Sequence, residues 1–193
     1  MKKNTLLAMM LLAAVILQCC QPADRTGAAG DTTTAVDHTR INSPGSAAIG
    51  DGIQTAMFLE KAVLMIKLET EWGRLAREKG GSLRVRNFGK GAEEELTTVK
   101  MPLNAIAAAK GLKLPDVLPV KEQVRLREMN RMEKEYFDKL YLKMVLEDYR
   151  KNIELFKGAV NSPDTMVSNF ARRFLPVLEK RGLQAVHFSK RYR

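Results

Sequence analysis

The sequence has few of the residues that bind metal ions or carry out nucleophilic catalysis. Its 193 residues include two cysteines and two histidines. The cysteines are the adjacent pair Cys19 and Cys20, which cannot build a disulfide framework. With histidine limited to His38 and His187, there is no suitable base for a Ser-His-Asp triad. Glycine-rich phosphate loops and Cys-x-x-Cys pairs are also absent from the sequence. We therefore predict no catalytic residues, no metal site and no cofactor.

The sequence also lacks extended runs of alternating β-branched residues, and this absence argues against a sheet. Glycine and proline are scarce outside a few places. Apolar residues instead recur at three- and four-residue steps over long stretches, which is typical of helices that bury one face. The pattern predicts an all-α protein. About 140 residues remain after the N-terminal region, enough for one domain with a real core.

The N-terminal residues predict export. Lys2 and Lys3 precede an apolar run over residues 6–17, which is too short for a stable membrane anchor. The run ends in Leu17-Gln18-Cys19-Cys20 and resembles the bacterial lipoprotein signal. That resemblance implies a signal peptide over residues 1–19 and lipidation of Cys20. Cys19 is a weaker candidate for the lipid, and an ordinary signal peptide is the alternative.

Residues 20–50 predict a flexible tether that carries the lipid. They are rich in Thr, Ala, Gly and Ser and have no apolar period. About thirty such residues reach roughly 30 Å by random-coil scaling. Gln21 is not the aspartate that resembles an inner-membrane retention signal, so we expect an outer-membrane anchor in the cell envelope. The domain would then face the periplasm or the cell surface.

Acidic residues are in deficit, and the excess of positive charge gathers near the C-terminus. The formal net charge is +10, or +8 once Lys2 and Lys3 are removed with the signal peptide. A basic surface attracts anionic lipid or polysaccharide. An exported protein rarely meets nucleic acid, so we expect no nucleic-acid partner. A solvated charged face is the alternative. The candidate polyanion-binding residues are Arg172, Arg173, Lys190 and Arg191.

Helical signals divide the domain, residues 51–193, into four main helices. The first begins near Asp51 or Gly52 and ends at about residue 79, and the second covers residues 82–111 with Ser82 as N-cap. The third covers about residues 135–156, and the last begins at Ser162-Pro163-Asp164. A long connection between the second and third holds a short helix over residues 121–132. This arrangement predicts a four-helix bundle.

Four segments of the chain, in order, carry a resemblance to a known family. They are Phe58-Leu59 with residues 68–76, residues 110–115, residues 136–138 with 141–142 and 144–145, and residues 174–179. Together they resemble an uncharacterised bacterial family of ferritin-like exported proteins, often labelled outer-membrane proteins, a domain of unknown function. The resemblance covers about residues 55–188 and implies a ferritin-like four-helix bundle.

The same resemblance implies a polar or metal site in the bundle core, but this chain lacks its histidines. The corresponding positions hold Leu96, Tyr149, Lys180 and Arg181. Ferritin-like di-iron sites use Glu-x-x-His motifs on two helices, and the chain contains none. A site made of carboxylates alone is the alternative, although Arg181 would repel a cation there. Its ligands would be Glu69, Glu95, Asp148 and Glu179.

Periodicity places charged residues on the inward faces of three helices. Glu69 and Asp148 lie on apolar stripes, and Arg181 lies on the stripe of the last helix. Of residues 93–95, at most one can point inward, since consecutive side chains diverge by about 100°. We predict a core polar cluster of Glu69, Glu95, Asp148 and Arg181, joined by a charge-assisted pair or triad. Alternatively, these side chains reach past the stripe to solvent.

These observations favour a lipid-anchored cell-envelope protein whose helical bundle binds a partner or serves a structural role without catalysis. Two alternatives stay open. One is a ferritin-like di-metal oxidase or metal-storage protein. The other is a binder of envelope polyanions through the basic last helix.

Overall fold

The computed structural model describes residues 44–192, which form five α-helices, a C-terminal 3-10 turn and no strand. The predicted signal peptide, Cys20 and most of the predicted tether lie outside the described residues. The all-α prediction is confirmed. The elements are α1 (Pro44–Lys79), α2 (Leu83–Ala109), α3 (Val120–Arg131), α4 (Lys134–Ala159), α5 (Thr165–Ser189) and η1 (Lys190–Tyr192).

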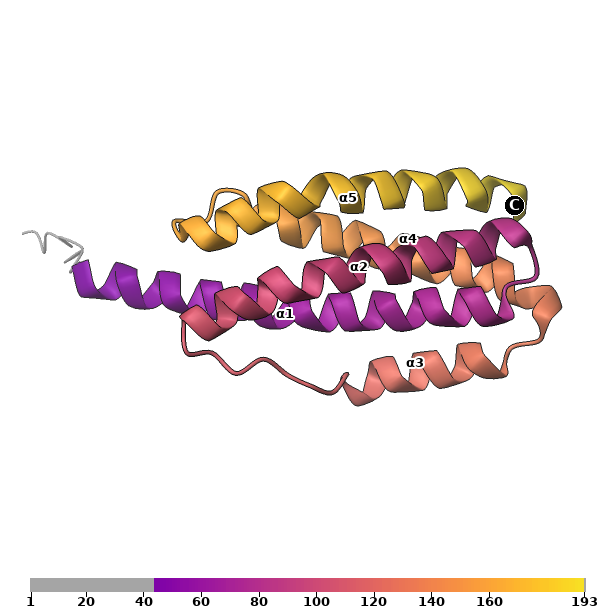
Figure 1. Cartoon of the computed structure of the whole chain (residues 1–193), viewed down its shortest axis with the longest axis horizontal. Helices are drawn as coiled ribbons and strands as arrows, with labels where there is room; N and C mark the ends of the chain where they lie inside the picture. Colours follow the sequence, from indigo (N-terminus) through magenta and orange to yellow (C-terminus); the bar gives the residue numbers. More distant parts are fainter. Residues whose placement is uncertain (1–43, 193) are drawn as a thin grey trace, which may run out of the picture. The chain divides into compact units, whose positions relative to one another are not determined.

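The four long helices form two antiparallel hairpins joined by one long connection. Helices α1 and α2 make the first hairpin, and α4 and α5 make the second (Figure 1). The connection after α2 returns along the length of the bundle and includes α3, which lies outside the four helices beside α1 (Figure 1). As a result α1 and α5 run one way, whereas α2 and α4 run the other. Each hairpin packs against the other through α1 with α4 and through α2 with α5.

The core is built from the apolar stripes that the helical period predicts. Its largest fully buried side chains are aromatic, and all have less than 2 % exposure. Phe137 stacks on Tyr141 with ring centroids 5.7 Å apart. At the other end of the bundle, Phe156 meets Phe58 edge-on at 5.3 Å. Such aromatic pairs add about 0.5–1.5 kcal/mol beyond the area they bury.

Two glycines bring α1 and α2 into backbone contact. A Cβ added at Gly73 would lie 2.7 Å from the Gly89 carbonyl oxygen. A Cβ at Gly89 would lie 2.5 Å from the Gly73 oxygen. Real Cβ atoms do not approach so closely, so any larger side chain would push the helices apart. The backbones of α1 and α2 therefore lie closer together at these two glycines than they could with any other residue there.

A buried aspartate fastens one end of the bundle. The carboxylate of Asp138, on α4, accepts hydrogen bonds from the backbone N–H groups of Gly81 (2.7 Å) and Ser82 (2.8 Å) in the α1–α2 turn. It also accepts one from the Tyr192 hydroxyl at 2.9 Å. One side chain thus ties the first hairpin, α4 and the C-terminal turn together.

Another aspartate fastens the opposite end. Asp164 is the N-cap of α5 and accepts hydrogen bonds from the backbone N–H groups of Met166 and Val167. It also forms an ion pair with Lys110, which follows α2. Thr55 of α1 donates to the same carboxylate at 3.4 Å. The start of α5 is therefore held by both helices of the first hairpin.

Three helix boundaries differ from the predicted ones. Helix α1 begins at Pro44, seven residues before Asp51, because proline is favourable in the first turn and Gly50 and Gly52 are tolerated within a helix. Helix α4 continues through Gly158 to Ala159. The N-cap of α5 is Asp164 rather than Ser162, whose hydroxyl instead accepts a hydrogen bond from the Asp164 N–H. Ser82 caps α2 as predicted.

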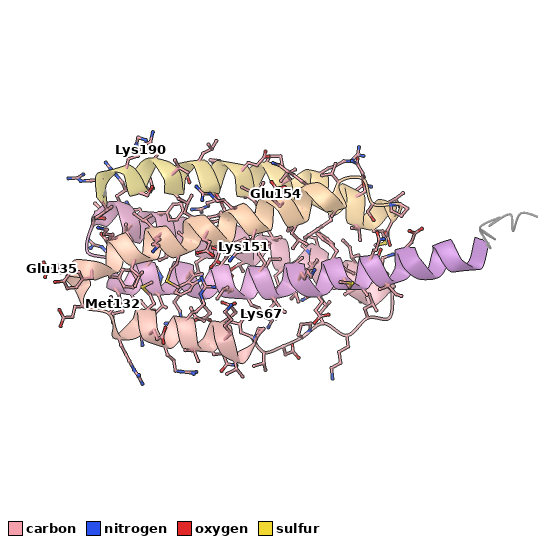
Figure 2. All side chains as sticks on the ribbon, turned by 180° about the vertical axis from the view of Figure 1, so that it is seen from behind. Lys67, Met132, Glu135, Lys151, Glu154 and Lys190 are labelled. Atoms are coloured by element: carbon pink, nitrogen blue, oxygen red, sulfur yellow. The ribbon has the colours of Figure 1, made fainter. Side chains whose placement is uncertain are left out.

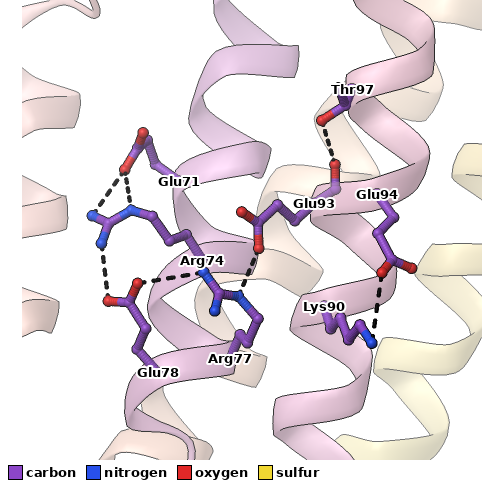
Figure 3. A network of polar contacts seen from close by, with 8 residues as sticks. All are labelled: Glu71, Arg74, Arg77, Glu78, Lys90, Glu93, Glu94 and Thr97. Carbon is purple, nitrogen blue, oxygen red and sulfur yellow. Dashed lines mark hydrogen bonds and ion pairs between the residues drawn. The ribbon is translucent and has the colours of Figure 1, made fainter.

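Charged side chains cover the outer face of α1 and α2. Arg74 forms ion pairs with Glu71 and Glu78 along α1, while Arg77 reaches across to Glu93 on α2 (Figure 3). These side chains are partly exposed, and exposed pairs contribute about 0–1 kcal/mol each. They therefore add little to the stability of the bundle. Among the described residues, no helix has the length and apolar character needed to cross a membrane.

Candidate functional site

A concavity with a polar floor, here called the α1–α4 cleft, lies between α1, α3 and α4. Its volume is about 830 Å³. Apolar walls come from leucines and Met144, and lysines stand among the other lining residues. Four side chains make up its polar floor: Glu69, Arg125, Asp148 and Asn152.

Glu69 is the most deeply buried charged residue of the floor. Its side chain is 1 % exposed and accepts a hydrogen bond from the Asn152 amide at 3.1 Å. Burial raises the pKa of Glu69 well above its usual value, and the nearby Asp148 charge raises it further. Arg125 and the Asn152 hydrogen bond oppose this shift without cancelling it. Glu69 is therefore a carboxyl group that retains its proton to unusually high pH.

Asp148 forms an ion pair with Arg125 of α3. One Arg125 nitrogen lies 2.9 Å from the Asp148 carboxylate, and another lies 2.5 Å from Glu122 on the same helix, α3. The Arg125 guanidinium also stacks over the Trp72 ring, 5.5 Å from its centroid. Across the described residues, the Trp72 indole nitrogen is the single fully buried side-chain nitrogen or oxygen without a hydrogen-bond partner. Trp72 is itself fully buried and does not line the cleft.

Helix α3 brings Arg125 to the cleft, and lysines of α1 contact α3 and the connection before it. Lys67, which lies between α1 and α3 in Figure 2, donates a hydrogen bond to the Asp116 carbonyl of that connection at 2.9 Å. Lys79 donates to the Asn130 carbonyl of α3. Met129 is the one buried residue of α3, and Leu126 also packs against the core. Polar contacts and apolar packing therefore position this helix together.

A second concavity, the α2–α5 cleft, lies between the first half of α2 and the end of α5. It has a volume of about 740 Å³ and is lined by Arg84, Arg181 and Arg191, with Glu95 as its one acidic residue. The Arg181 side chain is 7 % exposed, and its Nε donates to Glu95 at 2.7 Å.

Two features of α2 accommodate the Arg181 guanidinium. Nη1 donates to the Phe88 carbonyl at 3.0 Å, and the guanidinium lies over the Phe88 ring at 5.3 Å. A Cβ at Gly91 would lie 2.7 Å from Nη2, so the absence of a side chain there makes room for the arginine. Gly91 stands one turn before Glu95. Gly91 thus leaves space for the Arg181 guanidinium, and Glu95 supplies its charged partner.

The structure divides the predicted core polar cluster between the two clefts. Glu69 and Asp148 share the α1–α4 cleft, whereas Glu95 and Arg181 pair in the α2–α5 cleft. The expected joining of Arg181 to Glu69 or Asp148 does not occur, because Arg125 and Asn152 occupy the hydrogen-bonding positions beside those carboxyls.

Tyr149 lies between the two halves of this divided cluster. Its side chain is 1 % exposed. Burial raises the pKa of Tyr149, and the charges of Glu69 and Glu95 raise it further. A buried phenol therefore stands between the Glu69 and Glu95 carboxyl groups of the two clefts.

Residues 93–95 point in three directions, as their 100° spacing predicts. Glu95 turns to Arg181, Glu93 to Arg77 and Glu94 to Lys90. The four-carboxylate ligand set proposed as an alternative therefore does not converge, since an arginine holds Glu95. Within residues 44–192, no group of three or more His, Cys, Asp or Glu residues has the arrangement needed to hold a metal ion.

The four predicted polyanion-binding residues form two separate pairs. Arg172 and Arg173 lie in the first half of α5, and Lys190 and Arg191 follow its end in η1 (Figure 2). Eighteen residues of helix place the pairs roughly 27 Å apart. All four side chains are exposed. Of these, Arg191 alone lines the α2–α5 cleft, together with Arg84 and Arg181, which sequence reasoning did not include in that set.

Comparison with known proteins identifies the family. Residues 41–187 match the family described as Domain of unknown function (DUF4142). This range contains the four long helices almost completely, together with α3, the whole floor of the α1–α4 cleft and Arg181; Arg191 lies beyond it. No curated protein and no solved structure matches the chain. The match covers well over half of the sequence, so the protein belongs to the DUF4142 family.

Proposed function

We propose that the protein is a lipid-anchored cell-envelope protein whose helical bundle binds a small ligand in the α1–α4 cleft, as a binding protein rather than an enzyme. The cleft supports this proposal because it presents buried polar groups at the bottom of a space of about 830 Å³. Small-ligand sites commonly have this size, with apolar walls and a few fixed polar groups.

The floor favours a ligand that donates hydrogen bonds, such as one bearing a hydroxyl or amino group. The Asp148 carboxylate supplies acceptor oxygens and is fixed by Arg125. The Glu69 carboxyl, which retains its proton, can also donate a hydrogen bond. Lysines around the rest of the cleft attract any anionic part of such a molecule to its outer part. A ligand that carries both a hydrogen-bond donor and an acidic group could bind the floor through the donor and the lysines through the acid.

A ligand retained from the cell would provide the most direct test. The full chain, purified from its membrane, is examined by native mass spectrometry for a bound small molecule. We expect an adduct with the wild-type chain and a smaller one with Met144→Trp, which fills the cleft, and with Glu69→Gln. Glu154→Gln, on the exposed face of α4 (73 % side-chain exposure), is the matched control. Equal adducts in all variants, or none in any, would reject the cleft as the binding site.

The anchor is tested separately. Export and lipidation rest on residues 1–20, and the sequence supports Cys20 as the lipidated residue. Incorporation of a labelled fatty acid is expected in the wild-type chain and in Cys19→Ser, and loss of label in Cys20→Ser. Fractionation of the envelope then assigns the membrane, which we expect to be the outer one. Label that persists in Cys20→Ser but disappears in Cys19→Ser would move the lipid to the neighbouring cysteine.

The fold also supports a ferritin-like origin of the bundle. Two hairpins joined by one long crossover give the up-down-down-up order of helices seen in ferritin-like bundles (Figure 1). The residues present fit a metal poorly, because Arg181 holds Glu95 and no described group of ligands converges. Measurement of iron, manganese, zinc and copper per purified chain tests this point. One or two ions of a single metal per chain would favour the di-metal alternative over ligand binding.

A further inference from the structure

We propose that the α2–α5 cleft is a binding site for a phosphate group, formed by Arg84, Arg181 and Arg191. This site is separate from the α1–α4 cleft and does not depend on the function proposed for it. The three arginines come from two helices and the C-terminal turn and line one space of about 740 Å³. Guanidinium groups match the oxygens of phosphate with paired N–H donors, which lysine cannot do.

The charge balance of the cleft favours an anion. Its lining includes three arginines, no lysine and one acid, Glu95. Glu95 is engaged by Arg181 Nε, so it compensates one of the three positive charges and leaves two. A concave surface with low-dielectric walls concentrates such a field and attracts ions of opposite sign. A doubly charged phosphomonoester would neutralise the remainder.

Two of the three guanidinium groups are held in place before any ligand arrives. Arg181 is fixed by Glu95, by the Phe88 carbonyl and by stacking over the Phe88 ring. Arg84 stacks over Phe188 at 5.4 Å from the ring centroid. The two rings themselves pack edge-on, 5.6 Å apart, and form a rigid aromatic base. Side chains fixed in this way lose less entropy when they bind a ligand.

Neutral donors and the free end of Arg191 complete the site. Asn87 and Gln184 line the cleft and can each donate an amide N–H. Arg191 is exposed and stands on η1, whose position is set by the bond from Tyr192 to Asp138. Arg84 thus lines the cleft from α2, Arg181 from α5 and Arg191 from the C-terminal turn. A concave space lined by three guanidinium groups favours one compact anion over an extended polyanion.

The phosphate group could belong to a phospholipid headgroup or to a free phosphate, and the experiment distinguishes the two. Isothermal titration calorimetry is performed on the full chain in neutral detergent at low salt. The probes are inorganic phosphate, soluble dihexanoyl phosphatidate and, as a lipid without a phosphomonoester, dihexanoyl phosphatidylcholine. Binding of both phosphate and phosphatidate supports a site for the group itself. Binding of phosphatidate alone supports the site and assigns it to headgroups.

Matched charge variants locate the binding. We expect the double variant Arg84→Gln and Arg191→Gln to weaken binding at least tenfold. Arg172→Gln with Arg173→Gln removes the same charge from the first half of α5 and is expected to change affinity less than twofold. Both pairs are exposed, so each variant retains the fold, which circular dichroism verifies. No binding of either phosphate probe, equal weakening by the two double variants, or equal binding of phosphatidylcholine would overturn the proposal.

Discussion

Replacing Arg181 with leucine tests whether its buried guanidinium stabilises the bundle. The substitution removes two hydrogen bonds, to Glu95 at 2.7 Å and to the Phe88 carbonyl at 3.0 Å, together with the stacking on Phe88. Hydrogen bonds to charged groups contribute about 1.5–3 kcal/mol. Leucine recovers part of this through apolar burial in the same space.

The solvent exposure of Glu95 limits the loss. Breaking a fully buried ion pair costs about 3–5 kcal/mol, because the abandoned charge stays in the core. The Glu95 side chain is 41 % exposed, so its carboxylate can turn to water once Arg181 is gone. We therefore expect Arg181→Leu to lower the free energy of unfolding by about 2 kcal/mol, below the range for a fully buried pair.

Arg172→Leu is the matched control in the same helix. Arg172 is exposed and makes one long hydrogen bond, 3.3 Å, to the Val160 carbonyl, so its loss should change stability by less than about 0.5 kcal/mol. Urea denaturation followed by circular dichroism measures both midpoints at unchanged slope. Equal, small losses would show that Arg181 contributes no more than a surface arginine, and the reasoning would fail. Adding Glu95→Gln closes a double-mutant cycle, for which we expect a coupling of about 1 kcal/mol.

Three further predictions concern Glu69, Asp138 and the helix glycines. Because the folded-state pKa of Glu69 is raised, its stabilising contribution is greatest below the unfolded-state pKa and falls as pH rises to the folded-state pKa. The free energy of unfolding of Glu69→Gln should therefore equal that of the wild type near pH 4 and exceed it at pH 7–8. The difference should grow by up to about 1.4 kcal/mol for each pH unit between the two pKa values, as measured by denaturation at a series of pH values. A constant difference at all pH values would contradict this. Asp138→Ala should cost about 2–3 kcal/mol, seen as a lower melting temperature, since two backbone N–H groups and Tyr192 lose their acceptor; an unchanged melting temperature would count against it. Gly89→Ala should destabilise the protein by about 1–3 kcal/mol in urea denaturation, because its methyl group would clash with α1. Gly158→Ala, which has open space around it, should stabilise the protein by up to about 1 kcal/mol in the same assay. Stabilisation by both variants would mean that α1 and α2 can separate without cost.

The helices were predictable because each one buries a continuous apolar stripe. Their ends were less so, since the signals that end a helix are weak. Pro44 begins α1 within a segment whose small residues also suit a tether. Gly158 does not end α4, because one glycine costs only about 1 kcal/mol in a helix that packing already stabilises. Local preference decided neither boundary.

The candidate site was predictable in its inward residues and not in their partners. Helical period placed Glu69, Asp148 and Arg181 on buried faces, where the structure has them. It also predicted a short helix over residues 121–132, close to the observed α3, but not the place of this helix, because its sequence has few core residues. Arg125 was consequently missed. The pairing of Glu95 with Arg181 had one local signal, the glycine one turn earlier at position 91, which makes room for a large side chain.

The two ion pairs that line the clefts connect helices that have little apolar contact with each other. Arg181 and Glu95 connect α5 to α2, and Arg125 and Asp148 connect α3 to α4, whereas α1 and α2 meet through glycine backbones along their length. Clefts open where apolar packing is incomplete, so the residues that fasten these helices also line the spaces between them. A phosphate held by Arg84 on α2 and Arg191 beyond α5 would add a second connection across the same gap. Its binding would then stabilise the folded bundle by an amount that grows with the logarithm of the phosphate concentration above the Kd, because an anion that bridges both walls has no equivalent site in the unfolded chain.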